Sequence, residues 1–347
     1  MDSEQRVNFF RSLIQQVRKQ EFPYEPRAPK KMDWKSYTMA QISEVNDMLC
    51  MIRDIVDAAW RRLETRLREE AGPGLTPVPA PDLAKAVLVQ QYFGVSNREA
   101  EGLMLLFKEK LAVSRDFSYK SIERAYENQD VRRILDEVFA LTQTPVEGLE
   151  TSQAVDATGM PTTSKVNYEA VGKHTKRAGF EKIVTSIGTQ FKLYSSVIPM
   201  EHRDDSETLY FPAVMNDLRQ HTGIQFVLAD SAYISRKNCD LVESIGAKPR
   251  MMPKSNATLA RRGGDAYTHM AWEFMRDTQG WLRDYHLRSI AESGYSAEKR
   301  ANPNPIRRRI HGRKQTEMRA RFCNENLRRL CYMRYLDDIS VDFTRTT

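Results

Sequence analysis

The spacing of apolar residues divides the chain into a helical first part and a second part that contains strands. Residues 1–21 place apolar side chains on one helical face, beginning with Val7 and Phe10. Residues 38–70 form a longer pattern that is close to a heptad seam: Ile42, Val45, Leu49, Ile52, Val56, Ala59, Leu63 and Leu67. This helical N-terminal segment, residues 1–71, therefore contains either a dimerisation helix or a long helix that packs within its own domain.

A Pro- and Gly-rich linker over residues 72–82 leads to a second helical region, residues 83–145. We expect a helix over about 83–93 that Gly94 ends. A capping box at Ser96 and Glu99 opens the next helix, to about residue 111, and Ser118 caps a third. A last helix covers about residues 130–142. This order is typical of a helix-turn-helix DNA-binding region, with plain helical packing as the alternative.

From residue 150 the pattern changes to short apolar strands. Strands are predicted at 153–158, 181–187, 190–198, 225–230 and 249–252, with a hairpin turn at Gly188-Thr189. Helices are predicted at 206–221, 235–245 and 285–299. The order β-β-β-α-β-α-β-α predicts a mixed α/β, or α+β, domain over residues 150–300, in which helices flank a mixed sheet. This is the order of the ribonuclease H-like fold, here preceded by an all-α N-terminal region.

The composition is typical of a soluble globular protein and does not indicate a particular function. The 347 residues are 41% hydrophobic and 29% charged, and no apolar run approaches the ~18 residues of a membrane span. The N-terminus does not have the pattern of a signal peptide, so we expect a cytoplasmic protein. The spacing of Cys50, Cys239, Cys323 and Cys331 excludes a paired zinc motif, which predicts free and mostly buried thiols in a reducing compartment.

The positive charge of the chain is concentrated near its C-terminus. The formal net charge is +7, with a pI of about 9.1, which hints at a polyanionic partner. The segment 301–347 is basic and helical in pattern. The cations from residue 299 to residue 334 are Lys299, Arg300, Arg307, Arg308, Arg309, Arg313, Lys314, Arg319, Arg321, Arg328, Arg329 and Arg334. They favour a phosphate-binding surface over a merely solvated basic face.

Two aspartates stand out because each lies at the end of an apolar strand. Asp156 and Asp230 are 74 positions apart (230 − 156), and Glu292 follows Asp230 by 62 (292 − 230). Each aspartate has a structural alternative: Asp156 could start a turn before Gly159, and Asp230 could cap the following helix. Three carboxylates without a His or Cys cluster nearby suit Mg²⁺ or Mn²⁺.

The helix that carries Glu292 has a distinct polar stripe. At helical pitch, Tyr285, Arg288, Glu292 and Lys299 fall within roughly 60° of one another. The opposite side is apolar, and Gly294 on it would permit a close approach of backbone. The stripe sets one carboxylate among two cations and a phenol, which are groups that can hold a metal ion beside phosphates.

The spacing Tyr-(2)-Arg-(3)-Glu-(6)-Lys resembles the signature of DDE transposases of bacterial and archaeal insertion sequences. The resemblance implies that Asp156, Asp230 and Glu292 bind two Mg²⁺ or Mn²⁺ ions and are catalytic. It also implies that Tyr285, Arg288 and Lys299 touch DNA phosphates. The implied activity is cleavage of DNA at the ends of the element, followed by strand transfer into target DNA.

The same resemblance implies the partners of the protein. We expect double-stranded DNA, a homodimer or larger assembly on it, association with a prokaryotic nucleoid, and no membrane. Two alternatives remain: a metal-dependent nuclease of the same fold, and a DNA-binding regulator descended from a transposase.

Other residues have weaker signals. Lys173, Lys176, Arg177 and Lys182 either follow the DNA backbone or form a solvated face. Trp272 and Trp281 lie where related enzymes can place an aromatic residue that stacks on an extruded base, although core packing is the more common role of such residues.

Overall fold

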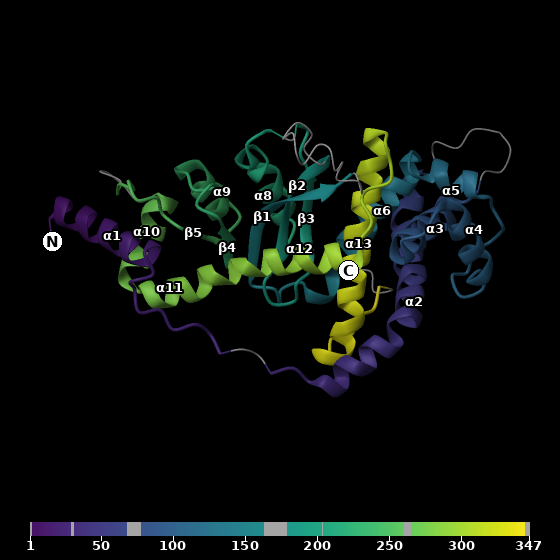
Figure 1. Ribbon diagram of the computed structural model, residues 1–347, viewed down its shortest axis with the longest axis horizontal. Helices are drawn as coiled ribbons and strands as arrows, with labels where there is room; N and C mark the ends of the chain where they lie inside the picture. Colours follow the sequence, from purple (N-terminus) through teal and green to yellow (C-terminus); the bar gives the residue numbers. More distant parts are fainter. Residues whose placement is uncertain are drawn as a thin grey trace, which may run out of the picture. The chain divides into compact units, whose positions relative to one another are not determined.

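The computed structural model in Figure 1 describes residues 2–28, 31–67, 78–162, 179–202, 204–259 and 265–343. It contains two compact units, each assembled from separate stretches of chain. The sheet unit consists of Met1–Lys31, Glu147–Gly159 and Lys182–Tyr295, and the helical unit consists of Met32–Val146, Met160–Glu181 and Ser296–Thr347. The domain limits expected from the sequence stay a prediction. The expected linker and Lys173, Lys176 and Arg177 fall mainly or wholly outside the described residues.

A mixed sheet of five strands forms the centre of the sheet unit, in the order β3-β2-β1-β4-β5. The strands are β1 (Ser152–Pro161), β2 (Phe180–Gly188), β3 (Tyr194–Pro199), β4 (Phe226–Ala229) and β5 (Lys248–Met251). Strand β4 is parallel to both β1 and β5, while β2 and β3 form an antiparallel hairpin. The mixed α/β class and the hairpin are confirmed, although β3 begins four residues later than expected because residues 189–191 form the turn.

One face of the sheet is covered by helices that come before, between and after its strands in the sequence. Val155, Val184 and Val227 are fully buried on this face. Their cluster includes residues of α1 (Ser3–Arg18), α8 (Phe211–Leu218), α9 (Arg236–Ser244), α10 (Ala266–Arg276) and α11 (Thr278–Tyr285). The helix expected over 206–221 is shorter, with a 3₁₀ turn at Glu207–Leu209 before α8.

The other face of the sheet meets α12 (Ser289–Ala301). Side chains alternate along a strand, so Thr185 and Ile187 point away from the face that Val184 covers. The Thr185 hydroxyl lies 2.7 Å from the Tyr295 hydroxyl. A Cβ added at Gly294 would lie 2.6 Å from Ile187 Cδ1. The close backbone approach expected at Gly294 is therefore confirmed.

The single helix expected over residues 285–299 is wrong in one respect. Helix α11 ends at Tyr285, a 3₁₀ turn follows at His286–Arg288, and α12 begins at Ser289. The tighter winding of the 3₁₀ turn changes the angular relation of residues on its two sides. As a result Tyr285 is only 8% exposed, whereas Glu292 is exposed.

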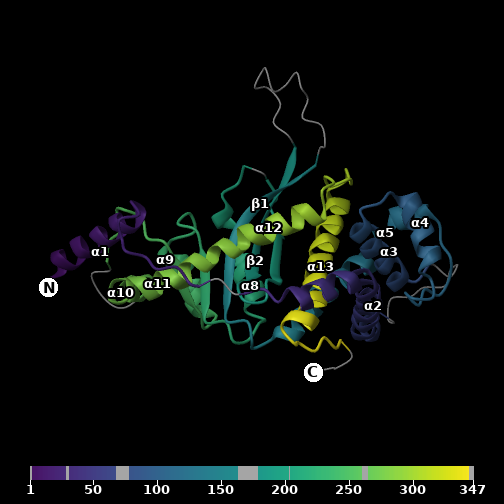
Figure 2. The same cartoon turned by 60° about the horizontal axis from the view of Figure 1, so that its bottom comes forward.

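The helical unit is built around α3 (Ala80–Phe93), whose residues from Asp82 to Gln91 are all buried. It packs against α2 (Trp34–Leu67), α4 (Asn97–Leu106), α5 (Tyr119–Ala125), α6 (Gln129–Leu141) and α13 (His311–Leu336). Figure 2 shows α2, α4, α5 and α13 around α3. Gly94 ends α3 with a left-handed φ of 64°, which glycine adopts at little cost. The capping box of Ser96 and Glu99 is present, but α4 ends at Leu106, five residues earlier than expected.

The apolar seam of α2 is used in two different ways. Leu49, Ile52, Val56 and Ala59 are buried within the helical unit, whereas Ile42 is 73% exposed and lies nearer the start of the helix. The part of the seam from Leu49 to Ala59 thus packs within its own unit. This is the second of the two alternatives for this helix, packing within its own domain. DNA reading by the region around α5 stays a prediction.

The basic residues of α13 mostly face carboxylates of the helical unit. The ion pairs are Arg313 with Glu123 and Glu127, Lys314 with Glu181, Arg319 with Asp136, Arg321 with Glu317, Arg328 with Glu44 and Glu325, and Arg329 with Asp337. These charges are thus partly compensated inside the unit, and the phosphate-binding surface expected from the sequence stays a prediction.

The structure also bears on the expected state of the cysteines and on membrane-spanning helices. Cys239, Cys323 and Cys331 are buried free thiols and Cys50 is a partly exposed one, as predicted. Across the described part of the chain, no helix is both long and apolar enough to span a membrane.

Candidate active site

Asp156 lies within β1, on the sheet face that α12 covers. Val155, the residue before it, points into the opposite cluster, so alternation turns Asp156 toward the α12 side. The backbone carbonyl of Asp156 accepts a 2.8 Å hydrogen bond from the Tyr295 hydroxyl of α12. Because β1 continues to Pro161, Asp156 does not start a turn before Gly159.

Asp230 follows the last residue of β4 and lies beside Asp156 across the sheet. Val155 and Ala229 are paired in the parallel register, so the two aspartates come next in line on strands that lie about 4.8 Å apart. The cap of α9 is Ser235, whose side chain accepts a hydrogen bond from the Asn238 N–H. The structural alternative for Asp230, a helix cap, is therefore excluded.

Glu292 stands in the first turn of α12, and Arg288 connects it to the two aspartates. A guanidinium nitrogen of Arg288 lies 3.5 Å from a carboxylate oxygen of Glu292. Burial alone would lower the pKa of Arg288, but Tyr285, Asp230, Asp156 and Glu292 together raise it above its usual value. Arg288 thus lies within electrostatic reach of all three acids.

The environment of Asp156 disfavours an isolated negative charge. Burial raises the pKa of its carboxyl above the usual value, and the nearby Glu207 and Glu292 carboxylates raise it further. The Ala157 N–H and the Arg288 guanidinium act in the opposite direction. A cation beside Asp156 would relieve this repulsion.

Tyr285 and Lys299, the other two residues of the stripe, have different surroundings. Tyr285 is buried and stacks on Trp281 with ring centroids 5.3 Å apart, and burial raises the pKa of its phenol. Trp281 is therefore a core residue, whereas Trp272 is 42% exposed. Lys299 is exposed but belongs to the helical unit.

Glu207 is a neighbour of the site that sequence reasoning missed. Its carboxylate lies 2.7 Å from the Lys182 ammonium and 3.4 Å from the Tyr233 hydroxyl. Glu207 sits in a short 3₁₀ turn, where neither periodicity nor a motif marks it. The ion pair also gives Lys182 a role inside the unit that was not anticipated.

Comparison with known proteins gives the family of the chain. Residues 148–330, more than half of the 347, match the family of the transposase DDE domain. The chain belongs to this family. It is also similar to a probable transposase for insertion sequence element ISA1214 of Archaeoglobus fulgidus, with 29% identity over 238 residues, 67% of this chain and 70% of that protein.

Family membership confirms several expectations together. The protein is a DDE transposase, an enzyme of DNA transposition with a ribonuclease H-like domain, and it acts on DNA. Enzymes of this family depend on divalent metal ions, so this transposase does as well. The identity of the metal and the roles of individual residues stay predictions.

The carboxylates of the three acids are chemically suited to bind a divalent metal ion, and Arg288 lies near them. Carboxylate oxygens are the ligands that hard cations such as Mg²⁺ prefer. Within the described residues, no group of three or more His, Cys, Asp or Glu side chains is arranged to hold one ion. The positive charge near Asp156, Asp230 and Glu292 comes from Arg288 instead.

Proposed function

We propose that this transposase cuts DNA at the ends of its element and joins the freed 3′-hydroxyl to target DNA at one site. The observation that supports this most is the convergence of Asp156, Asp230 and Glu292 around Arg288. The first two acids directly follow Val155 and Ala229, which are paired on neighbouring parallel strands, and α12 carries the third. Rigid strands hold such ligands more precisely than loops do.

We infer that the cofactors are two Mg²⁺ or Mn²⁺ ions held by Asp156, Asp230 and Glu292. When bound, such ions activate the attacking oxygen and stabilise the leaving oxygen of phosphoryl transfer. The carboxylates supply the hard oxygen ligands. A metal ion beside Asp156 would favour its ionised carboxylate, whose isolated negative charge burial disfavours.

Arg288, Tyr285 and Lys299 are the proposed phosphate contacts. A guanidinium can donate two parallel hydrogen bonds to one phosphate, which suits Arg288 for holding DNA next to the acids. Tyr285 is only 8% exposed, so little of its side chain is open to DNA. Lys299 is exposed, and its ammonium group is the proposed contact to a phosphate.

We also propose that the working form is a homodimer or larger assembly on double-stranded DNA, in the cytoplasm and close to the nucleoid. The first half of α2 supports self-association, because Trp34, Ile42 and Val45 are 70%, 73% and 47% exposed. Exposed apolar side chains at helical spacing are typical of an interface between helices.

The test is a plasmid assay with the DNA that flanks this reading frame and with Mg²⁺ or Mn²⁺. We expect Glu292→Gln to bind this DNA and to cut it at least ~100-fold more slowly than the wild type, since a metal ligand contributes more than its outer partners. The control variant is Glu243→Gln, which should cut normally. Glu243 lies in α9, and its side chain is 56% exposed.

Three results would argue against the proposal. Equal cutting by wild type and Glu292→Gln would mean that Glu292 is not a catalytic ligand or that a contaminating nuclease acts. Cutting without joining would indicate a nuclease of the same fold. Binding without cutting by every variant, the wild type included, would favour a DNA-binding regulator.

A further inference from the structure

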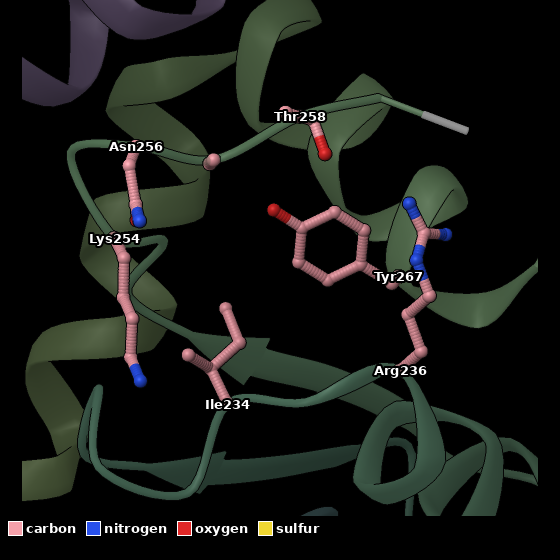
Figure 3. Close-up of a pocket in the computed structure, with 7 residues that line it drawn as sticks. Ile234, Arg236, Lys254, Asn256, Thr258 and Tyr267 are labelled. Atoms are coloured by element: carbon pink, nitrogen blue, oxygen red, sulfur yellow. The ribbon is translucent and has the colours of Figure 1, made fainter. Parts of the chain in front are cut away.

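A polar cavity of about 180 Å³ lies at the edge of the sheet from which Asp230 extends. Its walls come from Ile234 in the loop after β4, from residues 254–258 in the loop after β5, from Arg236 at the start of α9, and from Tyr267 of α10 (Figure 3). Strands β4 and β5 are parallel, with Ala229 paired with Met251, so both loops leave the sheet at the same edge.

The cavity is close to the proposed catalytic site along the chain and across the sheet. The Tyr233 N–H donates a 3.0 Å hydrogen bond to the Asp230 carbonyl, which closes a tight turn, and Ile234 comes next. Such turns bring their ends within about 7 Å between Cα atoms. The loop after β5 lies one strand spacing beyond β4, about 4.8 Å. A DNA strand held at Asp230 therefore has its neighbouring nucleotides within reach of the cavity.

The lining of the cavity is positive and rich in hydrogen-bond donors. Arg236 and Lys254 supply two cations, and none of the described residues that line the cavity is acidic. Arg236 pairs with Asp265 and lies 4.9 Å from the centroid of the Tyr267 ring. In contrast, the Lys254 ammonium has no ion-pair partner within the part of the chain that the structure describes.

Neutral hydrogen-bond donors also line the cavity. Figure 3 shows the Tyr267 hydroxyl directed toward the side of the cavity on which Asn256 and Lys254 lie, with Thr258 above the Tyr267 ring. Hydroxyl, amide and ammonium groups all donate hydrogen bonds to an anion. Together with the net positive charge, they suit a tetrahedral oxyanion.

The loop after β5 is held in place by a helix that is distant in sequence. Arg11 and Arg18 of α1 donate hydrogen bonds of 3.0 Å to the carbonyls of Ala257 and Pro253. Helix α1 is anchored because Phe10 and Ile14 are fully buried in the cluster under the sheet. Preorganised donors lose less conformational freedom on binding, so the loop is suited to hold a ligand.

We infer that this cavity binds a backbone phosphate of the DNA, on a nucleotide next to the one that is cut. Lys254, Thr258 and Asn256 donate to the phosphate oxygens, and Arg236 adds positive charge from the α9 side. The inference rests on the proposed function, because it takes the DNA strand to be held at Asp230. It adds a DNA contact made by the loops after β4 and β5, in addition to the residues of the polar stripe.

The test compares the double variant Lys254→Ala/Thr258→Val with Lys248→Ala. Lys248→Ala is a matched control, since this substitution removes the same charge from the other end of β5. The Lys248 side chain is 61% exposed and pairs with Glu273. Both variants change exposed side chains, and thermal unfolding should show them as stable as the wild type. The binding of a labelled linear duplex is measured by fluorescence anisotropy with EDTA present, so that no cutting occurs.

We expect the double variant to bind the duplex about tenfold more weakly near 0.1 M salt, while Lys248→Ala binds like the wild type. The slope of log K against log salt should become shallower by about 0.9 for the phosphate contact that is lost. Competition with inorganic phosphate at the same ionic strength should affect the wild type little, since a free phosphate lacks the remaining contacts of DNA.

Two results would overturn the inference while leaving the proposed function intact. One is an unchanged affinity and salt slope in the double variant. The other is an equal loss in Lys248→Ala, which would mean that net charge alone matters. A wild type that binds no duplex would instead remove the proposed function, and this site with it.

Discussion

Glu298 in the helical unit is a buried carboxyl whose charge the fold opposes. The residue is 4% exposed, and its Oε1 atom has no hydrogen-bond partner among the described residues. Burial raises the pKa of this carboxyl to about 7, and the Glu325 carboxylate adds to the effect. Arg321, Lys299 and Asn302 act in the other direction without cancelling it. Replacing Glu298 with Gln removes the charge and nearly keeps the shape.

The shift sets the size and the sign of the expected effect. Between its usual pKa of 4.5 and about 7, the folded protein holds a proton that the unfolded chain releases. The free energy of unfolding therefore falls as the pH rises through this window, and it levels off above it. With ~1.36 kcal/mol per pKa unit, the difference of 2.5 units (7 − 4.5) corresponds to about 3 kcal/mol.

Urea unfolding followed by circular dichroism checks this for wild type and Glu298→Gln near pH 5 and near pH 8. We expect similar stability near pH 5, and a variant that is more stable by up to about 3 kcal/mol near pH 8. The control is Glu317→Gln. This glutamate is also fully buried, but it lies 2.7 Å from Arg321 and accepts hydrogen bonds from the N–H groups of Arg307 and Arg308. The Glu317→Gln variant should be less stable than the wild type at both pH values, because the substitution removes the negative charge that pairs with Arg321.

The reasoning on Glu298 would be refuted by a stability difference between Glu298→Gln and wild type that does not change with pH. It would also be refuted by a variant that is less stable near pH 8, which would mean that the Glu298 charge is stabilised by groups around it.

Two further predictions concern α12 and α2. Gly294→Val should lower the free energy of unfolding by about 1–3 kcal/mol, because its side chain would overlap Ile187, whereas Val at the exposed neighbour Ser293 should cost less than about 1 kcal/mol; equal losses in urea unfolding would contradict the packing seen at Gly294. Ile42→Glu should shift the protein toward the monomer in light scattering coupled to size exclusion, with little change in thermal stability, since Ile42 is 73% exposed. An unchanged mass would place self-association elsewhere on the protein.

The sequence by itself determined the elements and the positions of the acids. Asp156 and Asp230 could be located because each directly follows apolar strand residues in the chain, and local pattern suffices for this, although β1 continues past Asp156 to Pro161. The capping box at Ser96 and the end of α3 at Gly94 were predictable for the same reason. Their signals lie within a few residues of the feature they predict.

Tertiary structure alone decided how exposed or compensated the charged and apolar faces are. The basic residues of α13 read as a DNA surface in the sequence, yet carboxylates from α2, α5 and α6 lie opposite many of them. Likewise, the seam of α2 is buried at Ile52 and exposed at Ile42, although the spacing is the same. A sequence shows which face of a helix is charged or apolar, but not which distant segment covers that face.

The same limit applies around the active site. Glu207 comes close to Asp156 through the packing of a 3₁₀ turn against the sheet, and Arg11 and Arg18 hold a loop more than 230 residues away along the chain. Arg288, in the 3₁₀ turn before α12, pairs with Glu292 and lies within electrostatic reach of Asp156 and Asp230. Such contacts depend on long-range burial and register, and local sequence patterns carry neither.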